Sequence, residues 1–108
     1  MQLSHYAYIY LGPGLNPQRD RADIQSKDYK LSIVGIDFAQ KNTVVDVAKK
    51  LTAEGVQMIE LCGGFGALWM ARVSEALNPD PENPIVPIGG VMYGPESRKP
   101  VLALLGKL

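Results

Sequence analysis

Glu60 and Cys62 are the two residues of this sequence whose types and spacing could support chemistry. They lie two positions apart in a short apolar segment, so in a strand their side chains would share one face. A carboxylate in such a segment is costly unless it is paired or protonated, and a helix N-terminus nearby favours the thiolate of a cysteine. Glu60 is therefore a candidate acid–base or hydrogen-bonding group, and Cys62 is a candidate nucleophile or proton carrier.

Each assignment has a structural alternative. Glu60 could pair with a cation such as Arg72 or Lys99, or lie at an exposed sheet edge, and Cys62 could be a small core residue. The single histidine, His5, begins the first apolar segment, at the rim opposite Cys62, which argues against a Cys–His pair. No residues have the spacing of a metal site, so we expect neither a metal nor a cofactor.

Three glycine-bearing loops follow predicted strands. Ligands of open parallel sheets bind at the carboxyl ends of the strands, and glycine lets the backbone approach a ligand closely. The loop after Cys62 leads directly into a helix, whose free N–H groups could hold a carboxylate or a phosphate. The alternative is that the glycines only permit tight turns between strand and helix. The candidate ligand-binding residues are Gly12, Gly14, Gly63, Gly64, Phe65, Gly66, Gly89 and Gly90, with Phe65 as an apolar wall.

Alternating strand and helix patterns would position these loops. Apolar runs rich in β-branched and aromatic residues predict four strands, over residues 5–11, 29–37, 56–62 and 85–91. Apolar residues at helical spacing predict helices that begin at Asn42 or Thr43, near residue 67 and at Pro95. Residues 17–25 fit either a short helix or a polar loop.

These elements predict a single α/β domain over residues 1–108. We expect a small three-layer sandwich with a mostly parallel four-stranded sheet, ordered 2-1-3-4 along the chain, of the flavodoxin-like or half-Rossmann kind. Residues 57–62 and 85–88 would be neighbouring parallel strands. If residues 17–25 are not a crossover helix, the first two strands could be antiparallel, which would give an α+β fold.

Composition narrows the class of partner. Eleven basic and eleven acidic residues cancel, which argues against nucleic acid and a membrane surface as partners. A lone cysteine and the lack of a signal-peptide pattern or a long apolar segment lead us to expect a cytoplasmic protein. The apolar final helix, together with Tyr6, Tyr8 and Tyr10 on one sheet face, favours a homodimer or a higher homo-oligomer.

Residues 54–56, Glu-Gly-Val, and residues 59–66, Ile-Glu-Leu-Cys-Gly-Gly-Phe-Gly, resemble the signature of a family of small uncharacterised bacterial proteins, a domain of unknown function. The resemblance extends to residues 34–35 and 47–51 and implies a shared α/β fold and loop, without an activity. A weaker similarity is to the cofactor-independent amino-acid racemases and maleate isomerases, which use two cysteines across two domains. This chain has one cysteine, so that chemistry would need a second subunit.

Two functional hypotheses follow. The first is a small-molecule-binding domain, enzymatic or not, that takes an anionic ligand at the glycine-rich loop 62–66. The second is a non-catalytic oligomeric interaction module, whose contact surfaces would be the final helix and the tyrosine face.

Overall fold

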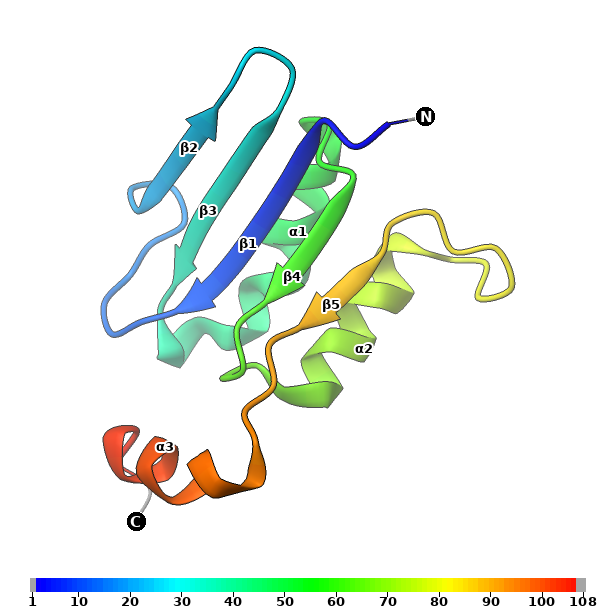
Figure 1. The fold of residues 1–108 in the computed structure, drawn as a ribbon. Helices are drawn as coiled ribbons and strands as arrows, with labels where there is room; N and C mark the ends of the chain where they lie inside the picture. The colour runs from blue at the N-terminus through cyan, green and yellow to red at the C-terminus, as the bar shows by residue number, and fades with distance from the viewer. Residues whose placement is uncertain (1, 107–108) are drawn as a thin grey trace.

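Five strands form one sheet in the computed structural model, which describes residues 2–106 (Figure 1). Their order across the sheet is β2-β3-β1-β4-β5. The strands are β1 His5–Leu11, β2 Arg21–Gln25, β3 Lys30–Ile36, β4 Met58–Leu61 and β5 Ile88–Gly90. All neighbouring strands are parallel except β2, which pairs antiparallel with β3. The chain therefore has a mixed α/β architecture.

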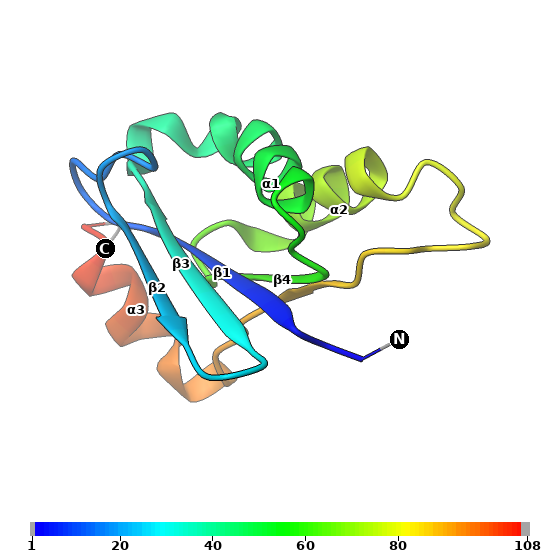
Figure 2. The same cartoon turned by 90° about the horizontal axis from the view of Figure 1, so that it is seen from above.

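Three helices connect or follow these strands. They are α1 Val44–Ala53, α2 Gly66–Leu77 and α3 Arg98–Leu104, and short 3-10 helices at Phe38–Thr43 and Pro95–Ser97 precede α1 and α3. The first two lie side by side on one face of the sheet (Figure 2). Within the described residues, no helix is long and apolar enough to span a bilayer.

The strand order confirms most of the predicted topology. The four predicted strands correspond to β1, β3, β4 and β5, which lie in the order β3-β1-β4-β5, the predicted 2-1-3-4. β4 and β5 are parallel neighbours joined by α2, as expected. The antiparallel alternative is wrong for the first two predicted strands, because β1 and β3 pair in parallel from His5 opposite Lys30 to Leu11 opposite Ile36.

The sheet has five strands rather than the predicted four, because residues 21–25 form β2 instead of a helix or a polar loop. Its sequence alternates between the two sheet faces. Arg21 and Asp23 lie on the helix-covered side, where they form ion pairs with Glu54 and Lys30, and Ile24 lies on the other side, opposite Leu31. Tertiary contacts thus determine the structure of residues 21–25, whose own sequence has only a weak strand pattern.

The last strand is shorter than predicted. Ile85 and Val86 bond to the Asn78 side chain instead of β4: its Oδ1 accepts their N–H groups at 2.7 Å each, and the first bond to β4 is from the Ile59 N–H to the Pro87 carbonyl oxygen at 3.1 Å. The Nδ2 of Asn78 donates to the Val86 carbonyl oxygen at 2.8 Å. The strand therefore begins at Ile88.

The core lies between the sheet and the pair α1 and α2. Alternate strand residues point into it, and the buried apolar side chains include Ile9, Val34, Ile36, Val44, Leu51, Ile59, Leu61 and Val73. Burial of this apolar surface on one side of the sheet holds the strands and the two helices together.

The opposite sheet face carries no helix over its strands. α3 lies on that side, but beyond the carboxyl ends of the strands rather than across them (Figures 1 and 2). The predicted second helical layer is therefore missing, because the segment before β3 forms an edge strand. We call this surface the open face; the strand pairing places on it Tyr6, Tyr8, Tyr10, Ala22, Ile24, Leu31, Ile33, Met58 and Glu60.

Candidate functional site

A pocket of about 700 Å³ lies at the carboxyl ends of β4 and β5. Parallel neighbours end at the same sheet edge, so the loop after β4 and the segment after β5 meet there. The first turns of α2 and one side of α3 complete the walls. The lining residues are mostly apolar and include Cys62, Gly63, Gly66, Met70, Gly90, Met92, Tyr93, Val101 and Leu102.

Two glycines allow the pocket walls to come close together. A Cβ atom added at Gly63 would lie 2.9 Å from Tyr93 Cε2 and 3.1 Å from the Val91 carbonyl oxygen. A Cβ atom added at Gly90 would lie 2.8 Å from Met70 Sδ. The distances of 2.9 Å and 2.8 Å to the Tyr93 and Met70 side chains are shorter than real Cβ contacts, so a side chain at either glycine would displace the residue that faces it.

Gly66 has a different role in the loop. Its φ of 78° is in the left-handed region, where glycine carries no Cβ penalty. It is the first residue of α2, whose free N–H groups therefore lie at the pocket wall.

Arg98 is the one charged side chain among the described residues that line the pocket. It lies in the first turn of α3, is solvent-exposed, and forms no ion pair within the part of the chain that the structure describes. A lone cation and a helix N-terminus on an otherwise apolar pocket favour an anionic group.

Cys62 lies in this pocket and is half-buried. Its Sγ accepts a hydrogen bond from the Leu11 backbone N–H at 3.3 Å, so the end of β1 orients the thiol. His5 is at the other end of β1, where its Nε2 lies 2.8 Å from the Ser32 Oγ. Burial lowers the pKa of His5. The structure thus separates the histidine from the cysteine.

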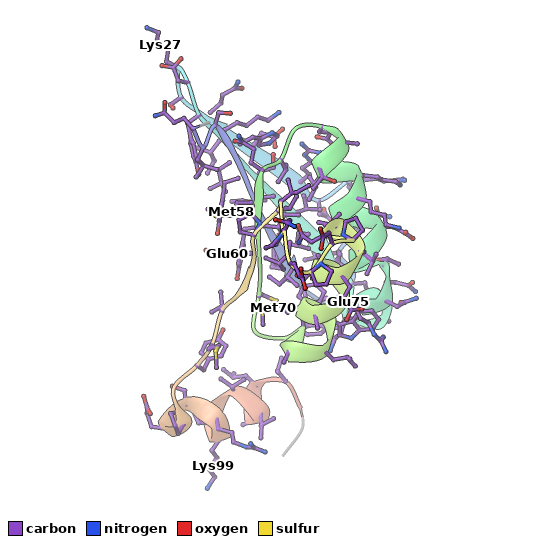
Figure 3. The ribbon with its side chains drawn as sticks, turned by 90° about the vertical axis from the view of Figure 1, so that its right-hand side faces the viewer. Lys27, Met58, Glu60, Met70, Glu75 and Lys99 are labelled. Atoms are coloured by element: carbon purple, nitrogen blue, oxygen red, sulfur yellow. The ribbon has the colours of Figure 1, made fainter. Side chains whose placement is uncertain are left out.

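Glu60 does not line the pocket. Figure 3 shows Glu60 and Met58 pointing away from α1 and α2, on the open face, whereas Met70 lies between α2 and the sheet. β4 lies between β1 and β5, so Glu60 is not on an edge strand. Its methylene groups cover Gly89, where an added Cβ atom would lie 3.4 Å from Glu60 Cγ.

The carboxylate of Glu60 has tyrosines rather than cations as neighbours. Tyr6 and Tyr8 flank it on β1, and the pKa of Tyr6 is raised by burial first and then by the Glu60 carboxylate. No ion pair of the described residues involves Glu60. Arg72, a partner considered from the sequence, lies on α2 with its guanidinium 4.6 Å from the centre of the Trp69 ring.

The other predicted residues are divided among several places. Phe65 is buried in the core and does not wall the pocket. Gly64 packs near Leu11 and the Cys62 thiol. Gly12 and Gly14 follow β1, and Gly14 lines a separate groove. The structure thus brings together Cys62, Gly63, Gly66 and Gly90.

Sequence reasoning missed the residues after β5. Met92, Tyr93 and Arg98 line the pocket, and so do Val101 and Leu102 of α3. Their signal was an apolar, glycine-flanked segment directly after a strand, followed by a basic residue at the start of a helix. That signal identifies a pocket wall only when α3 is known to lie beyond the same sheet edge.

The separate groove is about 800 Å³ and lies between α1, β2 and the loop after β1. Charged side chains of both signs line it, and two of them, Arg21 and Glu54, pair with each other at 2.6 Å. This pair joins the edge strand β2 to α1 across the groove. Within residues 2–106, no group of three or more histidine, cysteine or acidic side chains is placed to hold a metal ion.

A family model matches residues 4–106 of the chain, and its description is "Family of unknown function (DUF6506)". No curated protein matches the chain. No solved structure matches it either.

Proposed function

Since the chain belongs to the family of unknown function DUF6506, we propose its function from the pocket: the domain binds a small amphipathic anion at loop 62–66. The observation that carries this proposal is an apolar pocket of about 700 Å³ in which Arg98 is the single cationic side chain that residues 2–106 contribute to the wall. A pocket of this volume suits a small molecule, and apolar walls with a few polar groups are typical of ligand sites.

The chemistry of the walls points to the ligand class. Met70, Met92 and Tyr93 would contact an apolar or aromatic body, and methionine adapts its shape to such groups. Arg98 and the N–H groups at the start of α2 would hold a carboxylate or a phosphate.

Binding is better supported than catalysis. Cys62 lies in the pocket, but Glu60 points to the open face, so the two predicted catalytic residues do not share one cavity. A thiol without an acid–base partner lacks the arrangement that activates a nucleophile. Catalysis by Glu60 and Cys62 stays a prediction from the sequence.

A set of three aromatic compounds tests the proposal. Phenylacetate, 2-phenylethanol and phenethylamine share a ring and differ in the charge at the end of a short chain. We expect thermal stabilisation in the order carboxylate, alcohol, amine, because only the carboxylate matches Arg98. A ligand present at ten times its Kd stabilises the folded state by about 1.4 kcal/mol, which raises the Tm of a domain of this size by roughly 5–10 °C.

Arg98→Gln should abolish the preference for the carboxylate, and Lys99→Gln is the matched control, because Lys99 does not line the pocket. Phenylacetate should also slow the alkylation of Cys62 by iodoacetamide in the folded protein. A protein that no compound stabilises, or an Arg98→Gln variant that keeps the preference, would refute the proposal.

A further inference from the structure

The folded chain exposes more surface than its mass requires. Its accessible surface is 7124 Å², whereas a compact monomer of 11.8 kDa exposes about 5,900 Å². The excess is thus roughly 1,200 Å². The Cα radius of gyration is 14.4 Å, and a compact domain of this length has about 13 Å. The chain is therefore less compact than a typical monomer of its mass.

Two regions that expose apolar side chains lie near each other on one side of the molecule. α3 stands away from the strands beyond their carboxyl ends, with Leu104 88% exposed (Figure 1). The open face beside it is rich in aromatic and aliphatic side chains, with the Tyr8 and Tyr10 rings stacked at 6.4 Å and Ile24 59% exposed at its edge. Both regions lie on the side of the sheet that α1 and α2 do not cover (Figure 2).

We propose that a second copy of this chain covers the open face, and that the two copies exchange contacts through α3 in a two-fold dimer. In such a dimer, α3 of each copy packs against the open face of the other, so every contact forms twice. The inference rests on the exposed surface and is independent of the ligand proposed for the pocket.

The area fits this occupant. Two copies that each bury their excess would bury at most roughly 2,400 Å² in total, which exceeds the roughly 1,600 Å² of a standard stable interface. Larger, apolar interfaces are typical of obligate homodimers. Tyrosine and methionine, which the open face presents as Tyr6, Tyr8, Tyr10 and Met58, are enriched at such interfaces.

The charges are also complementary. Glu60 is the one charged residue of the open face, and it has no cationic partner within the described residues. The charged residues of α3 are Arg98 and Lys99, and Figure 3 shows Lys99 projecting away from the sheet and from α2. A second copy could therefore supply the cation that Glu60 lacks in its own chain.

Sedimentation equilibrium of the full chain tests the proposal. We expect a dimer across the micromolar range, and at least a tenfold increase in its Kd for Leu104→Glu and for Ile24→Lys. Leu68→Glu is the matched control, because Leu68 is 60% exposed on α2, on the opposite side of the molecule. All three substitutions replace exposed side chains, and circular dichroism should confirm that the variants fold.

The charge pair has its own test. Glu60→Lys should weaken the dimer, and adding Lys99→Glu in the same chain should restore it, because each exchanged contact is then reversed in sign. A wild-type monomer at high micromolar concentration would overturn the proposal. So would a dimer that neither Leu104→Glu nor Ile24→Lys weakens, because its interface would then lie elsewhere. A compact monomer in small-angle scattering, with α3 folded onto its own open face, would contradict it as well.

Discussion

Arg21→Met should measure how strongly the edge strand β2 is attached to α1. The Arg21 guanidinium donates two hydrogen bonds to the Glu54 carboxylate, Nη2 to Oε1 at 2.6 Å and Nη1 to Oε2 at 2.9 Å. It also approaches Asp23 Oδ1 at 3.3 Å. Methionine keeps most of the aliphatic length of arginine and removes the charge and the donors.

The expected cost combines two effects. The side chains of Arg21 and Glu54 are 26% and 41% exposed, so solvent screens the ion pair. A bidentate pair with this exposure contributes about 1 kcal/mol to the free energy of unfolding. Glu54 is also the C-cap of α1, where a negative charge opposes the helix dipole by roughly 0.5 kcal/mol once Arg21 is gone. The free energy of unfolding should therefore fall by about 1.5 kcal/mol, which lowers the Tm by roughly 6–12 °C.

Urea unfolding followed by circular dichroism, at one fixed chain concentration, measures this loss. Arg19→Met is the control: Arg19 pairs with its sequence neighbour Asp20 and is 67% exposed, so its loss should cost at most about 0.5 kcal/mol.

The pH dependence gives a second test of Arg21. The hydrogen bonds from Arg21 lower the pKa of Glu54 in the folded state. The stabilisation is therefore present above the unfolded pKa of glutamate and is lost as the pH falls through the lower folded value. The difference between wild type and Arg21→Met should shrink on acidification below about pH 4. A variant as stable as wild type at pH 7, or a difference that persists in acid, would refute this reasoning.

Two further substitutions test other parts of the structure. Asn78→Ala should lower the free energy of unfolding by about 3 kcal/mol in urea unfolding, because it removes the three hydrogen bonds that the buried Asn78 side chain makes to the backbone of Ile85 and Val86; Asn83→Ala, which removes one exposed hydrogen bond to Asp80, is the control, and equal losses would contradict the role of Asn78. Glu60→Gln should be measured in the Leu104→Glu background, which removes the proposed dimer. It should change the free energy of unfolding by less than about 0.5 kcal/mol, because no cation pairs with Glu60 within the described part of the chain. A loss of roughly 3 kcal/mol would indicate that Glu60 forms a buried ion pair after all.

Strong local patterns were sufficient to predict much of the fold. β1 alternates tyrosine with buried residues, and the apolar periods of α1 and α2 match the faces that they bury. β2 could not be predicted, because Ala22 and Ile24 are its only apolar residues. Its position depends on pairing with β3 and on the contact between Arg21 and Glu54.

For the candidate site, the sequence could place residues together only where backbone position decides their location. Cys62, Gly63, Gly66 and Gly90 line the pocket, because parallel strands end at a common edge. The directions of Glu60 and Phe65 could not be deduced, because each depends on which face of the sheet the helices cover. The face of α3 that contacts the pocket depends on the path of residues 91–97, which has no periodic pattern.

The position of β1 has a consequence for the synthesis of the protein. Of the five strands, β1 leaves the ribosome first, yet its two sheet neighbours are β3 and β4, the second of which ends at Leu61. The chain must therefore emerge as far as Leu61 before the central strand can be paired on both edges. Until then, its backbone donors and acceptors are open to other nascent chains, as the edges of an unfinished sheet are. The hydroxyl groups of Tyr6, Tyr8 and Tyr10 keep one side of β1 hydrated while its edges are unpaired.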